Sequence, residues 1–173
     1  PRSLFSLIER QRERLPEATQ RRLEAAAVAG VEFVHAPLAD ALDLDADTLQ
    51  STFDTLVRQR TWLREGEPSV LPDGRVGVRY VFTHAIYRHV LYELAGAAAR
   101  VQWHRRLAAA LLRAHGARVE EVAAEVAVHF EKGQDTAQAV QYLALAAQRA
   151  LQRFAAAEAA SIAQHALALL DTL

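Results

Sequence analysis

Histidines are the residues of this chain that could carry acid–base or metal chemistry, because its 173 residues include seven histidines and no cysteine. His84 and His89 lie five positions apart in a predicted helix, whereas one face of a helix repeats every three or four residues. His104 and His115 fall on the apolar stripe of another predicted helix, which favours packed or interfacial side chains. The remaining three are isolated in the sequence: His35, His129 and His165. The spacing therefore predicts no metal site.

Catalytic motifs are also missing from the sequence. It has no phosphate-binding G-x-x-x-x-G-K-[ST], no dinucleotide-binding G-x-G-x-x-G, no H-E-x-x-H and no G-x-S-x-G nucleophile turn. The lack of cysteine excludes disulfides, zinc–thiolate sites and a cysteine nucleophile. We therefore expect a chain that is not itself an enzyme and holds no cofactor on its own.

One segment, residues 80–92, has the residue types of an anion site. A strand is predicted to end at Phe82, and Thr83 can cap the following helix, which puts His84 in its first turn. Free backbone N–H groups and the positive end of the helix dipole favour an anion such as phosphate there. A histidine adds a donor whose charge can switch. The alternative is a histidine that only closes the strands onto the helix.

Helices are the main elements that must position this segment, because apolar residues recur at helical spacing along most of the chain. The predicted helices cover about residues 4–15, 17–29, 37–42, 47–60, 84–94, 98–115, 119–132, 136–154 and 156–170. Asp45, Asp47 and Asp135 are expected caps. Gly30 is an expected stop.

Residues 61–82 break this pattern, with two prolines, three glycines and many β-favouring side chains. The tripeptide Pro72-Asp73-Gly74 predicts a turn, since proline presets φ and glycine takes a positive φ. We expect a β-hairpin over about residues 68–82 and a short strand at residues 62–63.

The order of these elements predicts a mainly α fold in two parts. Residues 16–95 have the order of a winged-helix-like domain with one β-hairpin. Residues 97–173 are predicted to be antiparallel helices whose alternate members start roughly 36 residues apart, close to the period of tetratricopeptide-like (TPR-like) hairpins.

Charge gives little reason to expect nucleic acid as a partner. The formal net charge is −1, and the expected recognition helix, residues 47–60, contains Asp54 and has Arg58 and Arg60 only at its far end. No apolar run is long enough to span a bilayer, so no membrane contact is expected. The chain starts at Pro1 without an initiator methionine or a signal peptide. We therefore expect a cytoplasmic segment of a longer protein.

Several of these stretches together resemble a known family. Leu15-Pro16-Glu17 followed by residues 23–33 resembles the start of the winged helix in bacterial signal-transduction ATPases with numerous domains, the STAND class. Residues 82–88 resemble its F-x-H-[AP]-L-[IV]-R element, and residues 104–108 are similar to its L-H-R-R-[IL]-A stretch. Residues 121–130 resemble its E-x-[LV]-A-x-H-[FY] helix, and residues 139–150 resemble the start of its helical-repeat region. The class includes ATPase-bearing adenylate cyclases and large LuxR-type transcriptional regulators.

This resemblance implies that a P-loop ATPase core precedes the chain and that residues 1–15 end its lid. By position, His84 matches the histidine of the Met-His-Asp motif that touches the β-phosphate of ADP in related plant immune receptors and apoptotic ATPases. Thr83 and Ala85 stand in place of that Met and Asp. Arg88, one turn further on, is the second expected phosphate contact. ATP or ADP would bind only in the intact parent.

The expected function is therefore regulatory. The chain would couple the nucleotide state of its own ATPase core to a helical-repeat sensor that meets an inducer or a partner protein. The output of the parent would be transcription or cyclic-nucleotide synthesis. Two alternatives stay open: a stand-alone winged-helix DNA-binding module, and a helical protein–protein adaptor.

Overall fold

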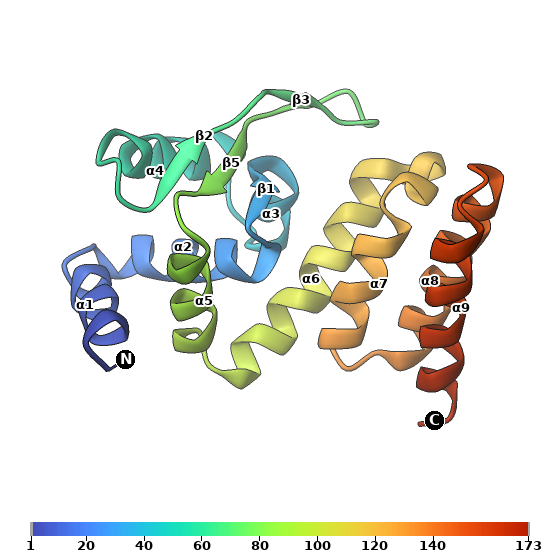
Figure 1. Ribbon diagram of the computed structural model, residues 1–173. Coiled ribbons are helices and arrows are strands. Elements are labelled where there is room, and N and C mark those ends of the chain that lie inside the picture. Colours follow the sequence, from blue (N-terminus) through green and yellow to red (C-terminus); the bar gives the residue numbers. More distant parts are fainter. Residues whose placement is uncertain (1, 173) are drawn as a thin grey trace.

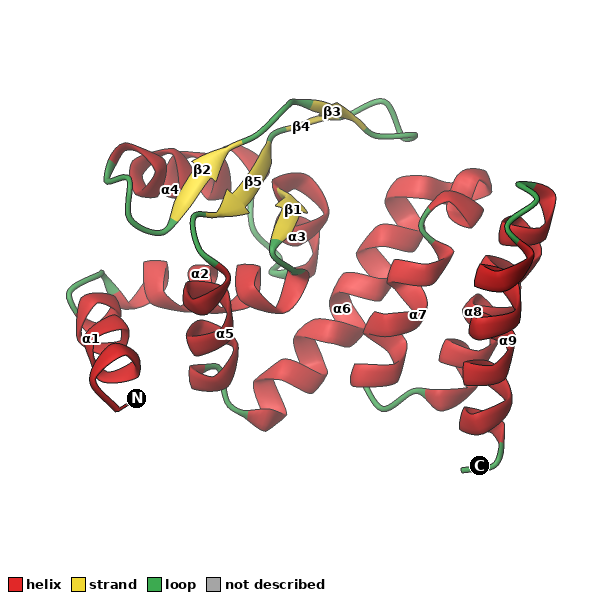
Figure 2. Cartoon of the chain, in the orientation of Figure 1, coloured by secondary structure: helices red, strands yellow, loops and turns green. Residues whose placement is uncertain are grey.

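The computed structural model describes residues 2–172 and is mainly helical with a small antiparallel sheet, which confirms the predicted fold class at this level (Figures 1 and 2). The α-helices are α1 (Arg2–Glu13), α2 (Glu17–Ala29), α3 (His35–Ala41), α4 (Ala46–Arg58), α5 (Ala85–Leu94), α6 (Ala97–His115), α7 (Ala123–Lys132), α8 (Thr136–Gln152) and α9 (Ala156–Leu170). A 3₁₀-helix, η1 (Gly116–Glu121), lies between α6 and α7. The strands are β1 (Glu32–Val34), β2 (Leu63–Glu65), β3 (Ser69–Val70), β4 (Val76–Gly77) and β5 (Arg79–Phe82).

Three of the strands form one sheet in the order β1-β5-β2, with β5 antiparallel to both neighbours. Phe33 pairs with Tyr80 on one side, and Leu63 pairs with Phe82 on the other. Strand β1 was not predicted from the sequence, because a strand of three residues is too short to show the alternation of apolar and polar residues that indicates a strand. The strand expected at residues 62–63 begins one residue later and ends at Glu65.

Aromatic rings from this sheet and from α4 form the centre of the N-terminal core. The ring centroids of Phe33 and Phe53 are 5.4 Å apart, and those of Phe53 and Tyr80 are 5.2 Å apart, both edge-on. The buried Tyr80 hydroxyl donates to Asp54 at 2.6 Å, so its polar end is satisfied. Burial and the Asp54 carboxylate raise the Tyr80 pKa.

The expected hairpin is present but is interrupted. Strands β3 and β4 pair with each other as a separate two-stranded ribbon that extends away from the sheet (Figure 2). The predicted turn is confirmed, since Gly74 has φ +90° and its N–H donates to the Leu71 carbonyl at 2.9 Å. Arg75 bonds both carboxylate oxygens of Asp40 on α3 and also pairs with Asp73, which fixes the ribbon against α3.

Local signals set several helix ends where they were predicted. Helix α2 has the predicted bounds, and Gly30 after it has φ +149°, which favours glycine. The Asp45 side chain accepts the N–H of Thr48, and the Asp135 side chain accepts that of Gln138. Asp47, the other expected cap, lies inside the first turn of α4. Helix α3 starts at His35, two residues before the proline expected to open it.

Helices α6 to α9 form an up-and-down row at the C-terminal end of the molecule (Figure 1). The single helix predicted over residues 119–132 is wrong, because η1 takes up residues 116–121 and α7 begins only at Ala123. Val122, with φ −121° and ψ 11°, separates the two. Val122 still packs against the same cluster as Val126 and Phe130 of α7, so the apolar spacing continues across the break.

Helix α6 belongs to both parts of the molecule. Its residues Leu107 and Ala110 lie in the same core as Leu23 of α2 and Leu38 of α3. Its residues Ala108 and Leu111 pack against Val126 of α7. Helix α6 therefore contributes to two separate apolar clusters, one with the N-terminal helices and one with α7. None of the helices in residues 2–172 is long and apolar enough to cross a membrane.

Candidate functional site

His84, the first predicted phosphate contact, lies two residues after the end of strand β5 and is exposed. It is the residue that caps α5, with φ −142° and ψ 140°, and no side chain caps this helix. The expectation that Thr83 caps the helix and that His84 lies in its first turn is therefore wrong. The Thr83 hydroxyl instead donates to the Thr61 carbonyl at 2.6 Å, because the end of β5 is tied to the segment before β2. Among the described aromatic rings, that of Tyr87 lies beside His84, with 5.6 Å between the two ring centroids.

Arg88, the second predicted contact, is directed toward α2. Its Nε donates to the Ala27 carbonyl at 2.8 Å, in the last turn of α2. A cation at the carboxyl end of a helix is stabilised by the helix dipole. Its guanidinium carbon also lies 4.7 Å from the centroid of the Tyr92 ring. Within the described chain no hydrogen bond joins Arg88 to His84, so the two side chains have separate partners.

A buried pair of histidines lies at the other end of α5. The Nδ1 atoms of His104 on α6 and His129 on α7 are 2.8 Å apart, and the Tyr92 hydroxyl lies 3.1 Å from His104 Nε2. His104 is 1% exposed and His129 is 4% exposed. At this distance one Nδ1 must donate a proton and the other must accept it, so the two rings adopt opposite roles. The row Tyr92–His104–His129 joins three helices by polar contacts.

Both histidines are held neutral by their surroundings. Burial lowers the pKa of His104 to about 3, and the nearby His129 and the cation Lys132 add to the effect. Burial likewise lowers the pKa of His129 to about 4, helped by Lys132. The expectation that His104 is a packed or interfacial side chain is confirmed. His129, which is isolated in the sequence, lies beside it in the structure. Their 25-residue separation spans two helices and a break, so no single-helix spacing could have revealed the pair.

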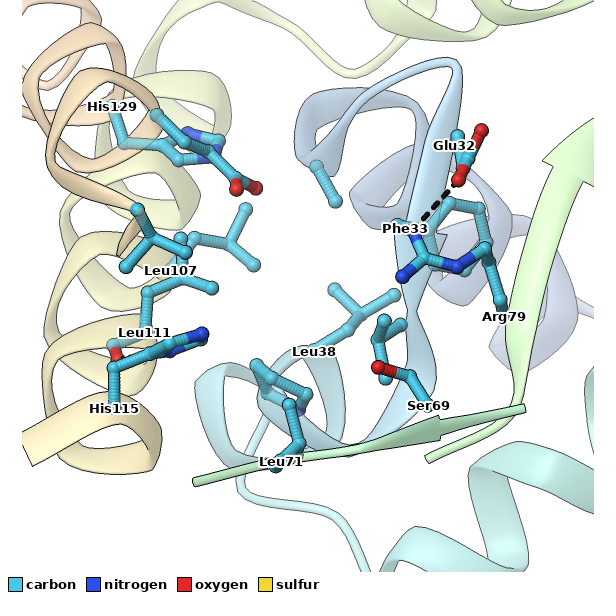
Figure 3. A pocket seen from close by; sticks show the side chains of 15 residues that line it. Glu32, Phe33, Leu38, Ser69, Leu71, Arg79, Leu107, Leu111, His115 and His129 are labelled. Carbon is cyan, nitrogen blue, oxygen red and sulfur yellow. Dashed lines mark hydrogen bonds and ion pairs between the residues drawn. The ribbon is translucent and has the colours of Figure 1, made fainter. Parts of the chain in front are cut away.

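A cavity of about 170 Å³ lies between α3 and β1 on one side and α6 and α7 on the other (Figure 3). Its apolar wall is formed by the side chains of Phe33, Leu38, Leu71, Leu107 and Leu111. Its polar wall is formed by those of Glu32, Arg79, His115, Glu125 and His129. Sequence reasoning did not find this cavity, because its walls come from segments that are far apart in the chain.

The charges at the cavity are not equally balanced. Arg79 pairs with Glu32 at 2.6 Å, and Figure 3 marks this contact. His115 Nδ1 bonds to the Leu111 carbonyl at 3.0 Å. Glu125 makes no ion pair and no side-chain hydrogen bond within residues 4–172. Glu125 is exposed, and the protein packed close to its carboxylate raises its pKa.

The elements expected to bind DNA are the β3–β4 ribbon and α4, and in the structure they do not form an open basic surface. The ribbon is held against α6, since the Asp73 N–H donates to the Ala114 carbonyl at 3.1 Å. Leu71 at the same end packs with Ala36 and Ala114. Helix α4 places its capping Asp45 at its amino end and directs Asp54 to Tyr80.

One face of α9 leaves apolar side chains uncovered in the described C-terminal region. Leu167 is 62% exposed and Leu170 is 47% exposed. Exposed alanines continue the same stripe at helical spacing toward the amino end of the helix: Ala156, Ala160 and Ala163.

Comparisons with known proteins add no relative. The chain matches no protein-family model, no curated protein and no solved structure. In the part of the chain that the structure describes, no group of three or more His, Cys, Asp or Glu side chains is placed to hold a metal ion.

Proposed function

We propose that this chain is the non-catalytic regulatory segment of a multidomain signalling ATPase of the STAND class. In this proposal, residues 1–15 end the ATPase lid, residues 16–95 form a winged helix, and residues 97–173 begin a TPR-like sensor. The element order α2-β1-α3-α4-β2-β3-β4-β5 and the sheet order β1-β5-β2 support the winged-helix assignment. The up-and-down row of α6 to α9 supports the helical-repeat assignment (Figure 1).

The observation that carries the proposal is the position of α5 between the expected phosphate contact and the helical row. Its amino end follows the exposed His84, and its last turns carry Tyr92. Tyr92 bonds His104 on α6, and His104 bonds His129 on α7. A shift of α5 caused by a nucleotide at His84 would therefore move contacts that reach the sensor helices. Because α5 is one packed helix, it can link the expected phosphate contact at one end to the helical row at the other.

Arg88 provides a second link in the same proposal. Through the Ala27 carbonyl it ties α5 to the end of α2, next to Gly30 and strand β1. Its guanidinium retains further N–H donors beyond the Nε that bonds Ala27, so a phosphate could still recruit it. Phosphate binding by Arg88 would then compete with its bond to α2, and α5 would loosen from α2.

The DNA-binding alternative receives less support from the geometry. A winged helix that reads DNA needs its ribbon and its recognition helix free to approach the phosphates. Here the ribbon end bonds Ala114 of α6, and the amino end of α4 carries acidic residues. The uncovered face of α9 agrees instead with a protein partner for the helical region.

The test of the proposed function is His84→Ala in the intact parent protein, with ADP retention and basal output as readouts. A hydrogen bond to a charged phosphate contributes about 1.5–3 kcal/mol, so ADP affinity should fall about 10- to 150-fold. Basal output should rise, because the resting state loses its nucleotide contact. His89→Ala is the matched control, since His89 is exposed on the same helix. Unchanged ADP retention in the His84 variant would overturn the proposal.

A further inference from the structure

The cavity between the two parts of the molecule has the size and shape of a small ligand site. Its volume is about 170 Å³, and an apolar protein cavity of about 150 Å³ can hold one benzene molecule. Phe33 and Leu38 come from the N-terminal part, whereas Leu107 and Leu111 come from α6. Figure 3 shows these two walls facing each other across the cavity. A ligand in it would contact both parts at once.

Glu125 gives this cavity a preference for one charge. Its carboxylate has no partner within residues 4–172, although it lines the cavity from α7. Arg79, the arginine that lines the cavity, is already paired with Glu32. The nearby imidazole of His115 is tied by Nδ1 to its own helix. The lining therefore holds two carboxylates and one guanidinium, so a ligand that supplies a cation balances the charge at Glu125.

We propose that this cavity binds a small organic amine, with an aromatic or branched aliphatic body in the apolar part and the ammonium group on Glu125. An anionic ligand would instead face Glu125 with the guanidinium of Arg79 already occupied by Glu32. A neutral ligand would fill the cavity but leave the carboxylate unpaired. Glu125 is exposed, so an amine can approach it from solvent. This inference concerns the 173-residue chain itself and does not depend on nucleotide sensing.

The experiment is a titration of the 173-residue chain with benzylamine, benzyl alcohol and benzoate, followed by amide NMR shifts. Benzylamine should shift the amides of Leu107, Leu111 and Val122, which line the cavity. Its affinity should exceed that of benzyl alcohol and benzoate at least fivefold. Benzylamine shifts elsewhere, or equal affinities for the three probes, would overturn the proposal.

Variants separate the charge from the cavity. Glu125→Gln should weaken benzylamine binding at least tenfold and leave benzyl alcohol binding within twofold, because only the ion pair is lost. Glu131→Gln is the matched control on the same helix, since Glu131 pairs with His165 outside the cavity and should not change either affinity. Val122→Phe should abolish binding of both probes by filling the space. Undiminished benzylamine binding by the folded Glu125 variant would refute the ion pair.

Discussion

The buried pair His104 and His129 should make the stability of this chain strongly dependent on pH. Both histidines stay neutral in the folded protein at pH values where an unfolded histidine is protonated. Acidification from about pH 7.5 to about pH 5 therefore adds protons to the unfolded chain only, and the free energy of unfolding falls. The contribution of the pair is complete above the unfolded pKa of about 6.5 and is lost as the pH falls toward the folded values.

The magnitude follows from the two depressed pKa values. At about pH 5, protonation stabilises each unfolded histidine by about 2 kcal/mol, while the folded residues, with pKa about 3 and about 4, remain mostly neutral. The pair should thus remove about 4 kcal/mol of stability between about pH 7.5 and pH 5. His35, whose pKa is lowered by burial, acts in the same direction. Glu125, whose pKa is raised by burial, acts in the opposite one.

The assay is urea unfolding at a series of pH values for the wild type and for His129→Asn. Asparagine keeps a polar atom near the Nδ1 position but cannot be charged. In His129→Asn, the free energy of unfolding should lose about half of the pH dependence that the pair causes. In the control His165→Asn, at an exposed histidine on α9, it should keep all of that dependence. A wild-type difference below about 1 kcal/mol, or an equal pH dependence in the His129 variant, would refute the reasoning.

Two further perturbations test other parts of the structure. In Gly77→Ala the new Cβ would overlap Val34 Cγ1, so the free energy of unfolding, measured in urea, should fall by about 1–3 kcal/mol. Gly66→Ala is the control, because its Cβ meets only ordinary contacts, and its free energy of unfolding should stay within about 1 kcal/mol of the wild type. Equal losses would contradict the packing argument. The adaptor alternative predicts concentration-dependent self-association of this chain through α9, measured by sedimentation equilibrium. Leu167→Glu should abolish this self-association, whereas Val70→Glu, at an exposed position of the ribbon, should not. A wild-type chain that stays monomeric at all concentrations would count against the adaptor alternative.

Local chemistry explains what the sequence could predict about the fold. The bounds of α2, the caps Asp45 and Asp135, and the turn at Gly74 all came from residues that act on their own neighbours. Helical periodicity gave the mainly helical class and most of the helices for the same reason. The errors fall where local chemistry is weak. Strand β1 depends on pairing with β5, and the break at Val122 leaves the apolar spacing unchanged.

The same distinction between local and long-range contacts applies to the candidate site. The sequence predicted a strand ending at Phe82 and a helix after it, but it put His84 in the first turn of that helix, where the structure has it as the capping residue. The resemblance by position gave His84 and Arg88 their expected roles, and the sequence could not show that Arg88 is directed to Ala27. The residue types alone excluded thiol chemistry and the common catalytic motifs. Only the tertiary structure brought His104 to His129 and left Glu125 without a cation beside a cavity. Such contacts join elements distant in the chain, and their burial and charge balance arise only when α6 packs between the two parts.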